Sequence, residues 1–171
     1  EDQERQITAH EDEGEGEHFE GNTLLEIAWT VAPIALVLIF AVIGWQVLGD
    51  VTQASEDEIE VRVTGAQWNW TFEYPELNGF VSTELVLEVD QRVKFVMTSK
   101  DVNHSFWVPE FRVKQDLVNG RETVVRVTPI EVDEYKLLCS ELCGTAHYNM
   151  VAPVRVLSAE DYAAWAAENT Q

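Results

Sequence analysis

The chain has 171 residues, 46% of them hydrophobic, which is enough for one ordinary domain with a core and a little more. Its 31 acids outnumber 11 Lys and Arg and give a formal net charge of −20. The acidity argues against nucleic acid as a partner, because phosphate binding requires a basic surface, and it suits a basic protein partner or salt-adapted solubility.

The first segment, residues 1–22, is strongly acidic. It holds nine acids and one base, with almost no apolar residues. A stretch of this composition cannot bury enough apolar surface to fold. We therefore predict a flexible, solvated N-terminal segment.

Residues 23–49 predict one transmembrane helix. No charged residue occurs between Glu26 and Asp50. At about 1.5 Å per residue, a helix of this length crosses a hydrocarbon layer of about 30 Å. Trp29 and Trp45 lie near its two ends, where indoles favour the membrane interface. A signal peptide would need a basic leader and a shorter apolar run, whereas the leader here is acidic.

Two regions follow the helix. Residues 50–157 contain stretches that alternate apolar and polar residues, separated by turn-forming Asn-Gly, Pro and Asp, as in a β-sandwich or barrel. The predicted strands are Glu58–Thr64, Glu84–Val89, Val93–Thr98, Thr123–Thr128 and Glu134–Leu138. Residues 158–171 predict a short C-terminal helix, with Ser158 as its N-cap and Asp161 three residues further on.

Both cysteines of the chain lie in one short stretch together with a histidine and a methionine. Cys139, Cys143 and His147 are each separated by three residues, and Met150 follows. A second histidine, His104, lies upstream. Two thiolates, two imidazoles and a thioether form a soft ligand set, which selects copper over hard cations.

The spacing alone leaves other chemistry open. Two Cys and two His could hold zinc tetrahedrally, although Met150 would then be idle. A disulfide between Cys139 and Cys143 is compatible with an oxidising compartment. A mononuclear blue-copper site would use a single cysteine and leave the other unexplained. Copper is favoured, with zinc and the disulfide as alternatives.

These motifs resemble those of cytochrome c oxidase subunit II. From Asp101 to Met150 the chain contains HSFWVP, VKQD, GR and CSELCG, then the His and Met, in that family's order. GAQWNWTFEYPE at residues 65–76 resembles the family's aromatic stretch, and LLEIAWTVAP at residues 24–33 resembles the start of its second membrane helix. The resemblance covers most of residues 24–157.

The resemblance implies an all-β, cupredoxin-like Greek-key barrel behind one N-terminal transmembrane helix, with the barrel on the outer face of the membrane. It implies subunit II of a haem–copper terminal oxidase, a cytochrome-c oxidase. In that family the dinuclear copper centre CuA accepts electrons from cytochrome c or a similar donor and passes them to haem in subunit I. There oxygen is reduced to water, coupled to proton translocation. The implied location is the plasma membrane of a prokaryote or, in second place, the mitochondrial inner membrane.

The resemblance also assigns copper ligands position by position. Cys139 and Cys143 would bridge the two coppers, and His104 and His147 would each be a terminal ligand. Met150 would be a weak ligand to one copper. Two bridging thiolates share one electron between two ions, so little would move on oxidation and electron transfer would meet a low barrier.

Glu141 receives two implied roles. Its backbone carbonyl would be the weak ligand to the other copper, and its carboxylate would reach Mg²⁺ or Mn²⁺ at the contact with subunit I. Nitrous oxide reductase, the alternative family, has a similar loop but an aromatic residue at this position. Glu141 and the membrane helix therefore favour the oxidase.

Two more residues receive roles from the resemblance. Trp68 would lie at the surface above the copper centre, where electrons enter, and Glu26 would lie near the entrance of a proton path into subunit I. Trp68 and Trp70 alternate, which predicts that both face the same side of a strand. Trp70 is also a candidate for the barrel core, together with Phe72 and Tyr74.

The chain departs from the family pattern at two points. Family members usually have two membrane helices, and only the second is visible here. Asn119 stands where the family often has Pro, before Gly120 and Arg121. We expect a local change of the turn and no loss of copper.

Overall fold

The computed structural model describes residues 20–170, so the predicted acidic segment, residues 1–22, lies almost entirely outside the described part. The chain divides between Val47 and Leu48 into two compact units. Each unit is described by itself.

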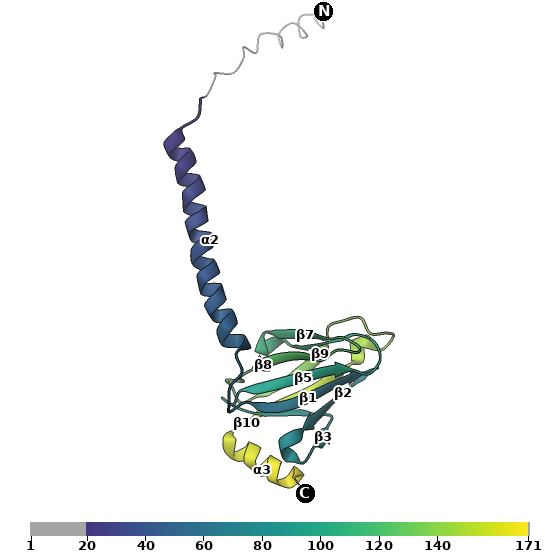
Figure 1. The fold of residues 1–171 in the computed structure, drawn as a ribbon. Coiled ribbons are helices and arrows are strands. Elements are labelled where there is room, and N and C mark those ends of the chain that lie inside the picture. Colours follow the sequence, from purple (N-terminus) through teal and green to yellow (C-terminus); the bar gives the residue numbers. More distant parts are fainter. Residues whose placement is uncertain (1–19, 171) are drawn as a thin grey trace, which may run out of the picture. The chain divides into compact units, whose positions relative to one another are not determined.

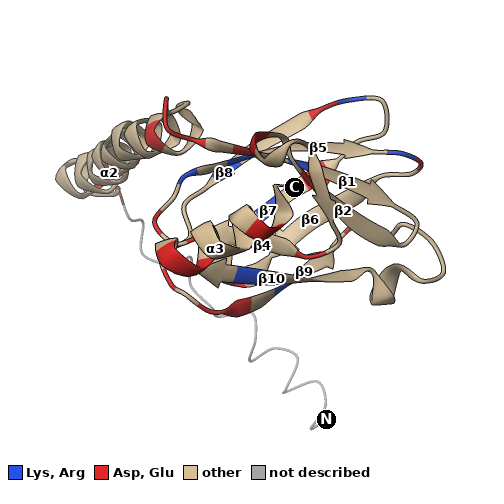
Figure 2. Cartoon of the chain, turned by 90° about the horizontal axis from the view of Figure 1, so that it is seen from below, with Lys and Arg blue, Asp and Glu red and all other residues tan. Residues whose placement is uncertain are grey.

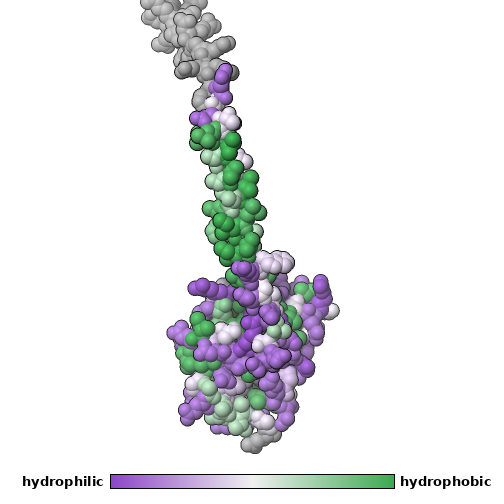
Figure 3. Space-filling view, turned by 60° about the vertical axis from the view of Figure 1, so that its left-hand side comes forward, coloured by the Kyte–Doolittle hydropathy of each residue, from purple (hydrophilic) through white to green (hydrophobic). Residues whose placement is uncertain are grey.

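Helix α2, Thr23–Thr52, contains the predicted apolar run (Figure 1). Asn22 caps its start, since its Oδ1 accepts the Leu25 N–H at 3.1 Å. The helix surface is hydrophobic along most of its length (Figure 3), and none of its residues is buried in the chain. In the described part of the chain, α2 is the one helix long and apolar enough to cross a membrane.

The second unit is a sandwich of two sheets and a short helix. One sheet consists of β1 (Ile59–Ala66), β2 (Asn69–Tyr74), β3 (Phe80–Ser82), β5 (Val93–Ser99) and β8 (Thr123–Val127). The other consists of β4 (Leu85–Glu88), β6 (His104–Val108), β7 (Val113–Leu117), β9 (Glu134–Cys139) and β10 (Val151–Leu157). The strand orders are β3-β2-β1-β5-β8 and β4-β10-β9-β6-β7. The predicted all-β class is confirmed.

Two parallel pairs show that the chain crosses between the sheets. β1 pairs parallel with β5, and β10 pairs parallel with β4, while the other pairs are antiparallel. Parallel neighbours cannot be joined by a tight hairpin, so longer connections must return the chain across the sandwich. The five predicted strands correspond to β1, β4, β5, β8 and β9.

The two sheets share one core, to which β2 contributes its largest side chains. Trp70, Phe72 and Tyr74 alternate along β2 and are all buried, as the core prediction required. The strand begins only at Asn69, so Trp68 lies in the turn between β1 and β2, and its side chain is 38% exposed. Trp68 therefore does not share a strand with Trp70, and the conformation of the turn determines the direction of its indole.

Helix α3, Ala159–Asn169, closes one end of the core. Ser158 caps it as predicted, since its Oγ accepts the Asp161 N–H at 3.2 Å. Its first turn is acidic (Figure 2), which suits the positive end of the helix dipole. Trp165 packs edge-on against Tyr74 and Phe80, with ring centroids 5.1 and 5.9 Å apart. The helix thereby covers the aromatic end of β2 and β3.

The Tyr74 side chain also forms hydrogen bonds with the backbone of β4. Its hydroxyl accepts the Val86 N–H at 2.7 Å and donates to the Val86 carbonyl at 3.2 Å. Because Val86 is buried, Tyr74→Phe leaves both backbone groups without a partner and should cost about 1–3 kcal/mol of unfolding free energy. Thermal denaturation measures this loss. Tyr148→Phe, at a site that is 83% exposed, is the control, and equal unfolding temperatures for both variants would contradict the role.

Candidate metal centre

The residues of the Cys/His/Met motif converge at one end of the sandwich. His104 begins β6, Cys139 ends the neighbouring β9, and the loop from β9 to β10 carries Cys143, His147 and Met150. The ends of this loop are pinned together, since the Cys139 N–H donates to the Met150 carbonyl at 3.1 Å. The fold thus brings together side chains from two strands and one loop.

Four distances define the arrangement of the soft donors. The sulfurs of Cys139 and Cys143 lie 3.7 Å apart. His104 Nδ1 lies 3.9 Å from Cys139 Sγ, and His147 Nδ1 lies 3.5 Å from Cys143 Sγ. Met150 Sδ lies 3.7 Å from Cys143 Sγ. Both cysteines are free thiols, and their separation far exceeds the S–S bond of about 2.05 Å, so the disulfide alternative is not formed here.

The spacing of the donors fits metal ligation. Metal–nitrogen and metal–sulfur bonds are about 2.0 and 2.3 Å long, so ligands of one tetrahedral ion lie between three and four ångströms apart. The ligand atoms of His104, Cys139 and Cys143 all lie within 4.8 Å of one another. The donor atoms of these three residues are therefore close enough together to hold a soft metal ion.

Most of the candidate ligands are buried, and burial disfavours the charged thiolates unless a cation is bound beside them. His104 and Met150 are fully buried, and Cys143 is 2% exposed. Burial, followed by the neighbouring Cys139, raises the pKa of the Cys143 thiol to about 11. Two buried sulfurs side by side resist ionisation unless positive charge lies between them, which a bound metal ion supplies.

Two tryptophans pack on the ligand loop. Trp68 Nε1–H donates to the Cys143 carbonyl at 3.3 Å, so its indole lies against the loop while it remains partly exposed. Trp70 Nε1–H donates to the Met150 carbonyl at 3.4 Å, and its ring meets the His104 ring edge-on at 6.1 Å. The structure thus places Trp68, partly exposed, against the loop that carries Cys143.

The two predicted acids lie in different places. The Glu141 carbonyl is 3.3 Å from Cys139 Sγ, and its side chain is exposed. Glu26 lies in the first turn of α2, in the other unit.

Two residues that sequence analysis did not single out contact the centre. Asp101 Oδ1 lies 2.7 Å from His104 Nε2, which leaves His104 Nδ1 facing Cys139. Gln67 Nε2–H donates to the Cys143 carbonyl at 2.7 Å. The only sequence signal was the position of Asp101 three residues before a candidate ligand histidine.

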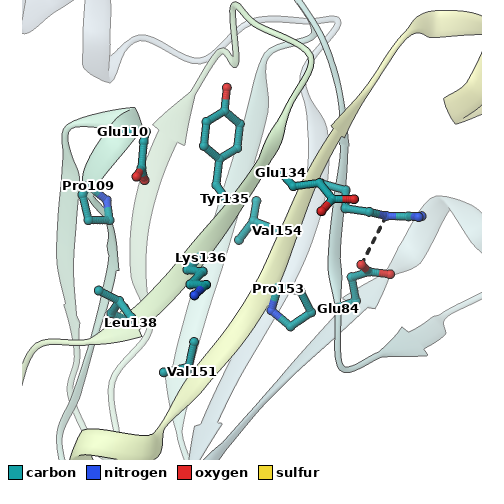
Figure 4. A pocket seen from close by; sticks show the side chains of 11 residues that line it. Glu84, Pro109, Glu110, Glu134, Tyr135, Lys136, Leu138, Val151, Pro153 and Val154 are labelled. Atoms are coloured by element: carbon teal, nitrogen blue, oxygen red, sulfur yellow. Dashed lines mark ion pairs between the residues drawn. The ribbon is translucent and has the colours of Figure 1, made fainter.

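A groove of about 630 Å³ opens on the outer face of β9 and β10, apart from the cluster (Figure 4). Leu138, Val151 and Pro153 form its apolar floor. On one side an ion pair joins Arg155 Nε and Glu84 Oε1 at 3.2 Å. The residues that line this groove include none of the candidate ligands.

The fold and the cluster together define a cupredoxin-like domain with a soft metal site, preceded by an apolar helix that could anchor it. The sequence profile described as cytochrome c oxidase subunit II, periplasmic domain, matches residues 80–158. The chain belongs to the cytochrome c oxidase subunit II family.

Curated relatives support this membership over most of the chain. The probable cytochrome c oxidase subunit 2 of Rickettsia bellii is 36% identical over 176 residues, which cover 90% of this chain and 65% of that protein. The subunit 2 of Bacillus subtilis is 35% identical, over 87% of this chain and 46% of that protein. The chain thus spans about half to two thirds of the length of these relatives. They favour the oxidase over the nitrous oxide reductase alternative.

A solved structure has the same fold. The periplasmic domain of subunit II of cytochrome oxidase (CoxB) of Bradyrhizobium japonicum superposes with a TM-score of 0.64 at 27% identity. The match covers 68% of this chain and 96% of that chain. The sandwich of the second unit is therefore the subunit II periplasmic fold.

Proposed function

We propose that this chain is the electron-accepting subunit of a cytochrome c oxidase and that its thiol cluster holds the dinuclear copper centre CuA. The observation that carries this proposal is the two-sided arrangement of donors around the sulfur pair. Cys139 has His104 and the Glu141 carbonyl beside it, and Cys143 has His147 and Met150. A tetrahedral zinc ion takes four ligands, so this set offers too many donors for one zinc and enough donors that it would hold two copper ions.

A bound CuA centre supplies one-electron chemistry, accepting an electron from a donor and releasing it to the next acceptor. The chain's own contribution is to hold the donor atoms in fixed positions and to exclude water from them. Cys143, Met150 and His104 are buried, and the bond between Cys139 N–H and the Met150 carbonyl fixes the loop ends. Fixed donors need little rearrangement when the charge of the site changes, which keeps the barrier to electron transfer low.

In this proposal Trp68 is the point where electrons enter, since its partly exposed indole also contacts the Cys143 carbonyl. The electrons pass on to haem in subunit I, where oxygen is reduced to water with proton translocation. The Glu141 carboxylate would help to hold Mg²⁺ or Mn²⁺ at the contact with subunit I, and Glu26 would lie near the entrance of a proton path. The partners are subunit I, the other oxidase subunits and the electron donor.

The apolar helix and the family support a location in a membrane. α2 anchors the chain in the plasma membrane of a prokaryote, and the copper domain lies on its outer face. There it meets a soluble or tethered donor.

The donor should be a basic protein such as cytochrome c, because the chain carries a formal charge of −20. In stopped-flow mixing with the copper-loaded chain, we expect reduction whose bimolecular rate falls as salt rises, since about 0.1 M salt screens charges beyond about 10 Å. An acidic c-type cytochrome is the control and should react more slowly at low salt. A rate for the basic donor that does not depend on salt would contradict electrostatic docking, and the absence of any reduction would contradict the function.

A further inference from the structure

The turn between β1 and β2 lies between the two segments that carry the candidate ligands. Gln67 in this turn uses both of its donor groups. Its side-chain amide donates to the Cys143 carbonyl at 2.7 Å, and its backbone N–H donates to Asp101 Oδ2 at 2.7 Å. One residue therefore bonds the ligand loop on one side and the segment that precedes His104 on the other.

Asp101 extends this connection to a ligand. Its Oδ1 lies 2.7 Å from His104 Nε2 and accepts the Val102 N–H at 2.7 Å, while its Oδ2 accepts from Gln67. A carboxylate on the second ring nitrogen fixes the tautomer and the orientation of a ligating histidine. A hydrogen-bonded chain thus runs from His104 through Asp101 and Gln67 to the backbone of Cys143.

Asn119 holds the Asp101 segment from the opposite side. Its side-chain amide donates to the Asp101 carbonyl, and its backbone N–H donates to Asn103 Oδ1 at 3.2 Å. A proline at this position could make neither bond, because it lacks the N–H and the amide. The segment that positions His104 therefore has a partner on each side in this chain.

Gly144 leaves the room that Gln67 needs to reach the loop. A Cβ at this position would lie 3.0 Å from Gln67 Nε2 and 3.2 Å from Trp68 Nε1. Its φ of +123° is also unfavourable for any residue with a side chain. The loop thus approaches the turn closely at the residue that follows Cys143.

We propose that Gln67 is a positioning residue that sets the placement of the Cys143 half of the ligand set relative to His104. This inference rests on the proposed copper function. The ends of the ligand loop are held by backbone pairing, but the Cys143 carbonyl in its middle is bonded by the side chains of Gln67 and Trp68. Without the Gln67 amide the middle of the loop loses its shorter bond, and the donors hold copper less firmly.

Copper release from the full-length chain in detergent tests the proposal. Gln67→Glu keeps the shape of the side chain but replaces the donating amide with a carboxylate, and Gln67→Ala removes the group without adding charge. Partners that orient metal ligands are worth about tenfold or more in affinity, so both variants should transfer copper to a chelator about tenfold faster than the wild type. Gln67→Asn, which keeps a donor on a shorter arm, should recover part of the loss. The copper hyperfine splitting in the EPR spectrum should also change, more in Gln67→Glu and Gln67→Ala than in Gln67→Asn.

Gln91→Ala is the matched control, because the Gln91 amide also donates to backbone carbonyls, those of Asp57 and Arg92, but at a different place. Wild-type release rates in both Gln67→Glu and Gln67→Ala would overturn the positioning role. Equal acceleration in Gln91→Ala, with equal loss of unfolding temperature, would show a general loss of stability and would also overturn it. A wild-type chain that takes up no copper would overturn the proposed function, and the positioning role with it.

Discussion

Replacing either Cys139 or Cys143 by Ser should abolish the dinuclear copper spectrum. Both sulfurs are buried, lie 3.7 Å apart and each contact a different imidazole, so neither can substitute for the other. Serine replaces a soft, ionisable donor with a hard hydroxyl that stays protonated at neutral pH. The expected result is complete loss of the visible bands of the loaded protein and a lower copper content, measured by absorption and metal analysis.

Met150→Leu is the control for a general disturbance of the loop. Met150 is fully buried and contacts Cys143 through sulfur, and leucine fills a similar volume. This variant should keep two coppers per chain and change only the potential, because the thioether is the weak ligand in our assignment. If a single Ser variant instead keeps two coppers and an unchanged visible spectrum, the assignment of bridging sulfurs is wrong.

The second large effect concerns Trp68. Trp68→Gln or Trp68→Ala should slow reduction of the copper-loaded chain by orders of magnitude at saturating donor, with little change in the donor concentration needed for half-saturation. The indole is partly exposed and hydrogen-bonded to the Cys143 carbonyl, so it offers a route from a docked donor to the ligand loop. Docking depends on charge over a wider surface, and removal of one neutral ring leaves that attraction in place.

Trp107→Gln provides a matched control for this experiment. Trp107 is 37% exposed, against 38% for Trp68, and it is the last residue but one of β6. It should leave the reduction rate unchanged. A Trp68 variant that is reduced at the wild-type rate at saturating donor would show that electrons enter elsewhere.

The features that sequence predicted best are local ones. The apolar run that forms α2 and the Ser158 cap are short-range patterns, and the copper motif lies mostly within one loop. Two of the strands that sequence missed, β6 and β10, lack a clear alternation of apolar and polar residues. β6 begins with three consecutive buried residues, so its buried and exposed positions do not follow period two. In β10 the exposed and buried positions do alternate, but apolar residues occupy both, including the exposed Val151 and Pro153.

The supporting shell of the site was not predictable because its contacts are long-range. Gln67 and Cys143 are 76 residues apart in the chain, and no local pattern connects them. The placement of Trp68 depends in the same way on a turn whose conformation the alternation of aromatic residues does not reveal. The candidate donor residues could be predicted from the sequence. The hydrogen bonds that orient His104 and hold Cys143 are seen only in the structure.

EPR of the copper-loaded wild-type chain, together with the copper content per chain, tests the central claim most directly. Two coppers that share one unpaired electron through Cys139 and Cys143 produce a hyperfine pattern with more lines than a single copper nucleus does. The account predicts two coppers per chain and this multiline pattern in the oxidised protein. One copper per chain with a single-nucleus pattern, or a spectroscopically silent metal such as zinc, would contradict it.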